Sequence, residues 1–100
     1  MLKNGTRKDL EAQLKHMPPR WRVGYGDGRN EYVLTISEHY RLFVRYRNTK
    51  PKGWVVFIGY PTKAFVNGTW DTVCARRKLL TQSFQTATAA AVAAQLHEGV

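Results

Sequence analysis

Hydrophobic and polar residues alternate strictly along residues 40–47. The even-numbered positions are aromatic or aliphatic, and the odd-numbered positions are Arg41, Phe43, Arg45 and Arg47. A period of two predicts a β-strand with one buried face and one face in contact with water. We therefore expect the solvent face of this strand to carry three arginines around one aromatic ring.

Three further segments have the pattern of strands. Residues 20–25 and 32–36 alternate in the same way, and residues 26–30 between them are rich in residues that suit turns. These two segments are predicted to form an antiparallel hairpin. Residues 54–60 are apolar on both faces, as in a strand in the middle of a sheet or covered on both sides, and Pro61 is expected to end it.

The pattern of residues 62–78 allows two interpretations. Asn67-Gly68, flanked by hydrophobic residues, is the strongest signal for a two-residue hairpin turn in the chain. The alternative is a short helix from about residue 70, with an acidic residue near its start and three basic residues near its end, as the helix dipole favours. We prefer the hairpin, and we expect residues 79–84 to be extended.

Two helices are predicted, one near each end of the chain. In the amphipathic segment 6–17, Thr6 is a good N-cap and Asp9 suits the first turn, and two prolines follow the segment. In the alanine-rich segment 86–97, Thr86 is the expected N-cap. The face of this second helix that is expected to pack on the sheet consists of Ala89, Val92, Ala93 and Leu96.

These elements together predict an α+β fold, with residues 1–100 as a single domain. We expect an antiparallel, mostly meandering sheet of four to six strands, packed by the C-terminal helix. The short N-terminal amphipathic helix is expected at an edge or an end of the sheet. A chain of this length buries roughly 60–65% of its unfolded surface, which is enough for a core.

The chain is strongly basic, with 16 lysines and arginines against seven acidic residues and a formal net charge of +9. No acidic residue lies between His39 and Trp70. A charge of this size speeds and strengthens association with polyanions. Nucleic acid is the first candidate partner, an acidic protein surface the second and an anionic membrane the third, and our prediction includes no membrane partner.

Ten residues are predicted to bind nucleic acid. Guanidinium groups pair with two phosphate oxygens at a time. Alternate residues of a strand lie about 6.6–7 Å apart, close to the phosphate repeat of one nucleic-acid strand. The alternative is a solvated face, but the nearly single sign of its charge favours binding. The predicted residues are Arg20, Arg22, Arg41, Phe43, Arg45, Arg47, Lys50, Lys52, Arg76 and Arg77.

The role of Phe43 is left open by the sequence. Its ring either stacks on an unpaired base, or contacts a thymine methyl group, or is covered by a second layer such as the N-terminal helix. The other aromatic residues near basic ones are assigned by default to the core, since most of them fall on the presumed core face. They are Trp21, Tyr25, Tyr32, Trp54 and Tyr60.

The sequence contains no catalytic signature, so we expect no enzyme, no metal site and no cofactor. Acidic residues are scattered, and the three histidines are far apart. Cys74 is the single cysteine, and it is either a reactive thiolate beside two arginines or a partly buried structural thiol. One cysteine, no signal peptide and no membrane-spanning segment predict a reducing cytoplasm.

Residues 83–91, Ser-Phe-Gln-Thr-Ala-Thr-Ala-Ala-Ala, resemble an ending in which a strand is followed by an alanine-rich helix behind the sheet. The DNA-binding domains of plant transcription factors and phage integrases that combine three strands and a helix are similar. The order helix, three strands, helix also resembles a double-stranded-RNA-binding domain. The lysine cluster that begins the last helix of the RNA-binding family is absent at residues 86–91, and no functional residue is carried over from either resemblance.

We therefore predict a small, basic, non-catalytic nucleic-acid-binding protein. DNA and RNA, and single and double strands, are equally compatible with this prediction, and the oligomeric state is left open. The alternative is an inhibitor or adaptor of the kind that phages and mobile elements encode, which would place its basic sheet on an acidic surface of a host protein. Both kinds of complex are expected to be sensitive to salt.

Overall fold

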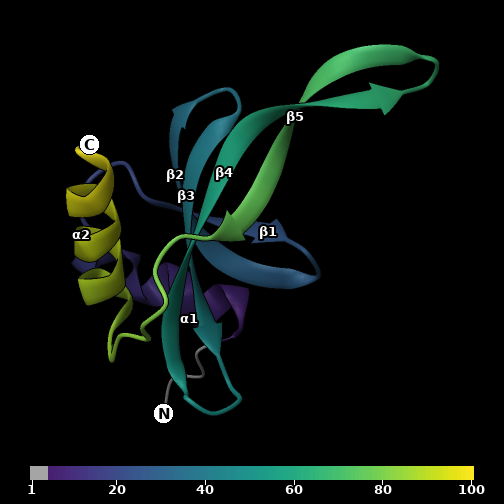
Figure 1. The fold of residues 1–100 in the computed structure, drawn as a ribbon. Helices are drawn as coiled ribbons and strands as arrows, with labels where there is room; N and C mark the ends of the chain where they lie inside the picture. Colours follow the sequence, from purple (N-terminus) through teal and green to yellow (C-terminus); the bar gives the residue numbers. More distant parts are fainter. Residues whose placement is uncertain (1–4) are drawn as a thin grey trace.

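A computed structural model describes residues 5–100 and shows a five-stranded antiparallel sheet with two helices (Figure 1). The strands follow one another in the order β1-β2-β3-β4-β5, so the sheet is a meander. This arrangement confirms the predicted α+β fold. The elements are α1 (Arg7–Gln13), a 3-10 helix η1 (Leu14–His16), β1 (Arg22–Gly26), β2 (Arg29–Ser37), β3 (Tyr40–Arg47), β4 (Gly53–Val66), β5 (Thr69–Lys78) and α2 (Ala87–Glu98).

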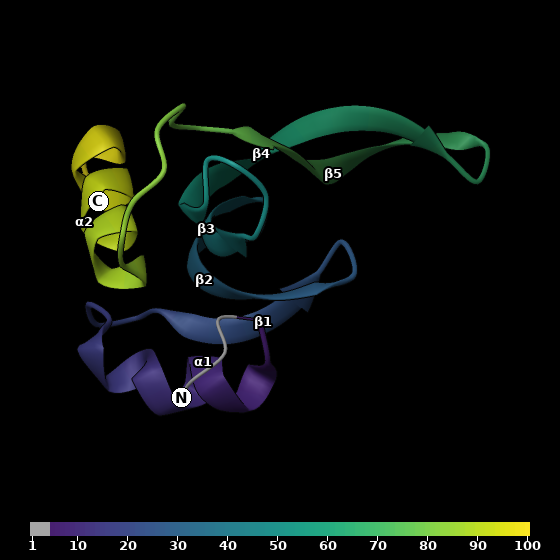
Figure 2. The same cartoon turned by 90° about the horizontal axis from the view of Figure 1, so that it is seen from below.

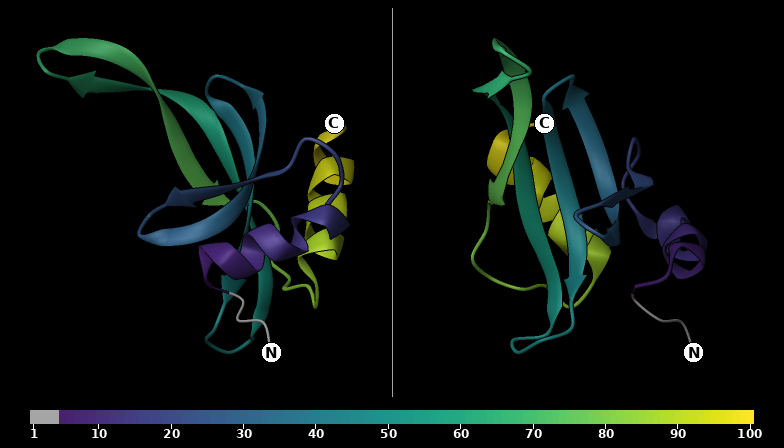
Figure 3. Two further views of the ribbon diagram at one scale, coloured as in Figure 1. Left: turned by 180° about the vertical axis from the view of Figure 1, so that it is seen from behind. Right: turned by 90° about the vertical axis from the view of Figure 1, so that its right-hand side faces the viewer.

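The sheet is strongly curled, and both helices pack on its convex face (Figure 2). α2 contacts β3 and β4, whereas α1 contacts β1 and β2. The core lies between the helices and this convex face, and it includes Tyr32, Leu34, Leu42, Val44, Trp54 and Val56. No helix of residues 5–100 lies over the concave face, which is seen from the open side in the right-hand view of Figure 3. This concave face carries the odd-numbered side chains of β2, β3 and β4.

Both helices begin at the predicted caps. The Thr6 side chain accepts a hydrogen bond from the Asp9 N–H at 3.2 Å, and the Thr86 side chain accepts one from the Ala89 N–H at 3.1 Å. Each threonine thereby satisfies one of the N–H groups that have no partner within the helix. Gly99 ends α2 with a φ of 72°, a left-handed conformation that glycine adopts without strain.

Two tight turns set the strand pairing. Asp27-Gly28 joins β1 to β2 and Asn67-Gly68 joins β4 to β5, with φ values of 50° and 77° in the first turn and 50° and 82° in the second. Positive φ at both central residues is the geometry that matches the twist of a hairpin. The hairpin at residues 67–68 is therefore confirmed over the competing helix, and the loop predicted over residues 26–30 is a two-residue turn.

The prediction that Pro61 ends its strand is wrong, because β4 continues to Val66. The Leu79 N–H donates to the Val56 carbonyl. The backbone N–H and C=O groups of the even-numbered residues of β4 therefore point towards β5, and those of the odd-numbered residues point towards β3. The last pair between β3 and β4 at this end is Arg41–Gly59. The nitrogen of Pro61 therefore points beyond the end of β3, where a missing N–H costs no ladder hydrogen bond.

The prediction of the packing face of α2 is also wrong, because the helix is rotated about its axis and packs on another side. Val92 and Leu96 are 44% and 78% exposed, whereas the Trp21 indole donates to Gln95 Oε1 at 2.9 Å and sets the helix on another face. Methyl side chains there let α2 approach β3 and β4 closely. The residues of α2 that are buried against the sheet are Ala87, Ala90, Ala91 and Ala94. The expected packing face was Ala89, Val92, Ala93 and Leu96.

Residues 79–84, which were expected to be extended, form no strand of their own; Leu79 still donates its N–H to Val56 of β4, and Phe84 pairs with Trp54 at the end of the segment. There, Phe84 and Trp54 exchange two backbone hydrogen bonds of 2.8 Å as an isolated bridge.

Beyond Gly59, β4 pairs with β5 alone, and the two strands project from the body as a two-stranded ribbon (Figures 1 and 3). We call residues 60–75 the β4–β5 arm.

Candidate functional site

Strand pairing arranges the concave face in rows that cross the sheet. One row runs from Arg22 on β1 through Val33, Phe43 and Phe57 to Lys78 on β5. The neighbouring row consists of Thr35, Arg41, Gly59 and Arg76. The strict alternation of β3 thus places its three arginines on one face, as predicted, and that face is the one without helices.

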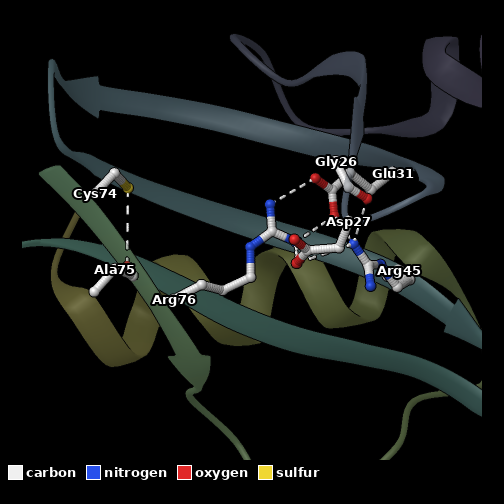
Figure 4. A network of polar contacts seen from close by, with 7 residues as sticks. All are labelled: Gly26, Asp27, Glu31, Arg45, Cys74, Ala75 and Arg76. Carbon is white, nitrogen blue, oxygen red and sulfur yellow. Dashed lines mark hydrogen bonds and ion pairs between the residues drawn. The ribbon is translucent and has the colours of Figure 1, made fainter. Parts of the chain in front are cut away.

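A buried carboxylate lies at the centre of this face (Figure 4). Glu31 is 1% exposed, and both its oxygens accept hydrogen bonds of 2.9 Å from Arg76, while Arg45 donates a further bond of 2.9 Å. The Arg45 guanidinium also donates to the carbonyl of Gly26 at 2.8 Å. Asp27 adds a more exposed carboxylate, 3.3 Å from the Arg76 guanidinium.

This network corrects the expectation of three open arginines on β3. The side chains of Arg45 and Arg76 are only 12% and 21% exposed. A carboxylate as buried as Glu31 needs opposite charge and hydrogen bonds to offset its lost hydration. Two of the predicted binding arginines are therefore occupied within the protein.

Phe43 is covered, and the cover is neither a base nor the N-terminal helix. The Arg76 guanidinium lies 3.7 Å from the centroid of the Phe43 ring, and Phe43 is 5% exposed. Gly59 leaves room for the Phe43 ring, because a Cβ there would lie 2.9 Å from the ring and 2.7 Å from the sulfur of Cys74. Phe43 is thus part of the packing that holds Arg76 in place.

A groove of about 810 Å³ opens beside the network on the concave face. Arg20, Arg22 and Arg41 line it, and within residues 5–100 no acidic side chain forms an ion pair with any of them. Arg41 Nε is shielded from solvent and has no hydrogen-bond partner, so its guanidinium has more donor capacity than the protein uses. The residues lining this large groove are Arg20, Arg22, Gly24, Tyr25, Asp27, Glu31, Val33, Thr35, Arg41, Phe43, Cys74 and Arg76.

A second groove, of about 440 Å³, lies on the other side of Arg45. Its cationic lining includes Arg29, Arg47 and Lys78 beside the apolar side chains of Val55 and Phe57. Arg47 donates to the Thr49 hydroxyl at 3.2 Å and to the Lys50 carbonyl at 3.3 Å. It therefore connects this small groove to the exposed loop that contains the predicted Lys50 and Lys52.

Arg77 is the predicted site residue that the fold separates from the others. It pairs with Ile58, whose side chain is in the core, and its guanidinium lies 5.6 Å from the centroid of Tyr60. Arg77 therefore lies on the convex side of β5, opposite Arg76.

Sequence reasoning missed four charged residues of this face, one of which, Asp27, lies in the turn between β1 and β2. Glu31, Arg29 and Lys78 are all brought there by strand pairing. The sequence did contain a signal for Glu31. It is an acidic residue at a position that alternates with the core residues of β2, on the same side of the strand as Val33 and Thr35. Nothing local in the chain indicates that Arg76, 45 residues away, reaches it.

The ionisable groups with shifted pKa values lie on the convex face, away from both grooves. Burial raises the pKa of Tyr32 to about 12, and its hydroxyl donates to the Leu10 carbonyl of α1 at 2.8 Å. A hydrogen bond from Tyr40 is the main cause that lowers the pKa of Glu98 on α2. These bonds connect the two helices to the sheet.

The default assignment of aromatic residues to the core holds for three of the five. Trp21, Tyr32 and Trp54 are buried, whereas Tyr25 is 69% exposed and Tyr60 is 36% exposed.

Within residues 5–100, no cluster of three potential metal ligands is found, and no helix has the length and apolarity to cross a membrane. Cys74 is exposed and borders the large groove. Comparison with known protein families, curated proteins and solved structures finds no match to this chain. The function is therefore inferred from the geometry and charge of the concave face itself.

Proposed function

We propose that this protein is a non-catalytic nucleic-acid-binding module that holds a phosphate backbone along its concave face. The observation that carries the proposal is the large groove with Arg20, Arg22 and Arg41, none of them in an ion pair within the described chain. Guanidinium groups bind phosphate oxygens through two parallel hydrogen bonds. A groove lined by such groups on an open sheet face suits a polyanion better than a small neutral ligand.

The overall charge supports the same partner. A net charge of +9 on 100 residues attracts nucleic acid from a distance and opposes self-association. The small groove adds Arg29, Arg47 and Lys78 on the same concave face, with Lys50 and Lys52 in the adjoining loop. The two grooves together offer a path for several consecutive phosphates across the sheet.

The proposal assigns different roles to the predicted residues. Arg20, Arg22 and Arg41 contact phosphate in the large groove, and Arg47, Lys50 and Lys52 do so at the small groove. Arg45, Arg76 and Phe43 shape the surface from beneath, because the first two pair with Glu31 and the third is covered. Contacts of this kind are to the backbone, so we expect modest sequence specificity.

A titration of fluorescein-labelled single-stranded and duplex oligonucleotides tests this proposal by fluorescence anisotropy. We expect binding at about 50 mM salt that weakens by at least about tenfold at about 200 mM, because each phosphate contact releases counterions. The triple variant Arg20→Ala/Arg22→Ala/Arg41→Ala is expected to lose most of the affinity. Its matched control is Lys8→Ala/Lys15→Ala/Arg77→Ala, which removes the same charge outside the concave face.

The competing class of partner is an acidic protein surface. A pull-down from nuclease-treated extract separates the two, because a nucleic-acid-binding module should retain no single protein once the nucleic acid is removed. Retention of one protein partner, together with no binding of any oligonucleotide at low salt, would overturn the proposal. Equal loss of affinity in the groove variant and in its charge-matched control would show that the concave face is not the binding site.

A further inference from the structure

The tip of the β4–β5 arm carries two exposed aromatic rings. Phe65 and Trp70 are 63% and 71% exposed, they are paired across the hairpin, and their ring centroids lie 5.5 Å apart at an interplanar angle of 54°. Only the pair Val66–Thr69 separates them from the Asn67-Gly68 turn that ends the arm, and the arm itself projects from the body (Figure 1). Two large rings exposed together mark an interaction surface more often than an accident of composition.

The face that carries these rings continues the concave face of the sheet. Gly59–Arg76, Pro61–Cys74, Lys63–Thr72 and Phe65–Trp70 are successive pairs of one alternating face of the ribbon. The first of these pairs borders the large groove and the last is the aromatic pair. Between them, Lys63 donates to the Thr72 hydroxyl at 2.7 Å and forms no ion pair within residues 5–100. Arginine, lysine and aromatic rings therefore follow one another outward along a single surface.

We infer that the Phe65–Trp70 pair stacks on unpaired bases of the strand whose phosphates lie in the large groove, so that the partner is single-stranded. This inference rests on the proposed function and deepens it. Single-strand binders combine a cationic groove that follows the backbone with exposed rings on which bases stack, and the stacking is tolerant of sequence. In a duplex the bases are paired inside the helix, and the rings at the tip would have no free base to contact.

The reach of the arm sets the length of strand required. Six residues separate Gly59 from Phe65, and an extended strand rises about 3.3 Å per residue, which gives about 20 Å. A single strand advances about 3.4 Å per nucleotide when its bases stack on one another, and about twice that when its phosphates follow alternate residues of a β-strand, so about three to six nucleotides connect the groove to the tip. An oligonucleotide of about two nucleotides is too short to occupy both places in either case, whereas one of about 12 nucleotides is long enough.

The test compares oligothymidylates of these two lengths on the full-length protein and its variants. We expect Phe65→Ala/Trp70→Ala to weaken binding of the longer strand by about 5- to 150-fold, the range measured when a stacking ring is removed. The affinity of this variant for the short strand and for a duplex should stay within about twofold of the wild-type value. The short strand does not reach the tip, and the duplex offers it no unpaired bases. Trp70→Phe keeps a stacking ring and should retain most of the affinity. Leu96→Ala, which removes an exposed apolar side chain from α2, is the matched control.

Tryptophan fluorescence gives a second readout in the unmodified protein. Trp21 and Trp54 are 4% and 3% exposed, so Trp70 is the exposed one of the three. Stacking on a base should quench the emission of Trp70 with the longer strand, and the quenching should disappear in Trp70→Phe while the affinity remains. No quenching by a strand that binds would overturn the inference.

Three other outcomes would also overturn it and leave the proposed function standing. They are an equal loss of affinity for the short strand, an equal loss for the duplex, and a wild-type dimer that dissociates when Phe65 and Trp70 are replaced. The last result would make the tip a contact between two copies of the chain. Failure of the wild-type protein to bind any oligonucleotide at low salt would instead remove the proposed function itself.

Discussion

Two groups of arginines on the same concave face are used in opposite ways. Arg45 and Arg76 share the buried carboxylate of Glu31. Arg20, Arg22 and Arg41 line the large groove without an ion pair in the described chain. The number of arginines on a sheet face therefore does not measure its capacity to bind a polyanion, because one buried acidic residue turns two of them into structural residues.

The two groups also depend on each other. The guanidinium of Arg76 crosses from β5 to β2 and joins the two sides of the curled sheet (Figure 4). The curl places Arg22 on β1 and Arg41 on β3 around the same groove. The internal ion pairs therefore help to maintain the shape in which the unpaired arginines come together.

The largest effect is expected from breaking the structural group. Glu31→Gln leaves the largely buried Arg45 and Arg76 with only the more exposed carboxylate of Asp27 as counter-charge, and loss of one partner of a buried ion pair costs about 3–5 kcal/mol. The melting temperature should fall by at least about 12 °C, since 1 kcal/mol corresponds to about 4–8 °C in a domain of this size. Thermal unfolding followed by circular dichroism measures this change.

Glu11→Gln is the control for this variant. Glu11 pairs with Arg7 on the surface of α1, where both side chains are more than half exposed, and such pairs contribute about 0–1 kcal/mol. An unchanged melting temperature for Glu31→Gln would show that the network is not structural.

A smaller loss is expected when the packing around the Phe43 ring, on which Arg76 lies, is overfilled. In Gly59→Ala the added Cβ would lie 2.7 Å from the Cys74 sulfur and 2.9 Å from the Phe43 ring, and overpacking of this kind costs about 1–3 kcal/mol. Urea unfolding should show a lower midpoint with an unchanged slope. Gly5→Ala, at a glycine with open space around it and no left-handed φ, is the control for an added methyl group that overlaps nothing. A midpoint unchanged in Gly59→Ala would contradict the described packing.

The features that could be predicted from the sequence are those that depend on residues close together in the chain. The faces of β3, the two caps and the Asn67-Gly68 turn depend on residues close together in the chain, so their patterns were sufficient. The packing face of α2 was predicted wrongly because nearly every residue of that helix is small and apolar, which leaves its periodicity little contrast. The contact of Arg76 with Glu31 depends on the curl of the whole sheet, which no local pattern reports.

A loss of about 1 kcal/mol is expected on the convex face. Tyr40→Phe removes the hydroxyl that donates to Glu98, and a typical hydrogen bond contributes about 0.5–1.5 kcal/mol. The lowered pKa of Glu98 stabilises the fold above its ordinary value of 4.5, and this contribution is lost as the pH falls through the folded pKa. The raised pKa of Tyr40 means that its contribution is complete below 10.0 and is lost as the pH rises through the folded pKa.

Urea unfolding of the wild type and Tyr40→Phe across pH checks this. The difference between their free energies of unfolding should be largest between pH 4.5 and pH 10.0 and should shrink on either side. Oligonucleotide binding should be unchanged throughout. A difference that does not vary with pH would contradict the assigned hydrogen bond.

The smallest effect on stability is expected in the second group of arginines. Single alanine variants of the exposed Arg20 and Arg22 should each change the free energy of unfolding by no more than about 0.5 kcal/mol, as is usual for surface side chains without specific partners, and that of the half-buried Arg41 should stay below about 2 kcal/mol. Chemical denaturation measures these values. A cost above about 2 kcal/mol for any of them would place that arginine in the structural group instead.

The most direct test of this division is the salt dependence of single-strand binding by the wild type and by Arg20→Ala/Arg22→Ala/Arg41→Ala. Each phosphate contact contributes about 0.7 to the slope of log affinity against log salt for a single strand, so the slope of the triple variant should be smaller by about 2. The melting temperature should stay close to that of the wild type. An unchanged slope, or a triple variant that no longer folds, would contradict the assignment of these three arginines to binding.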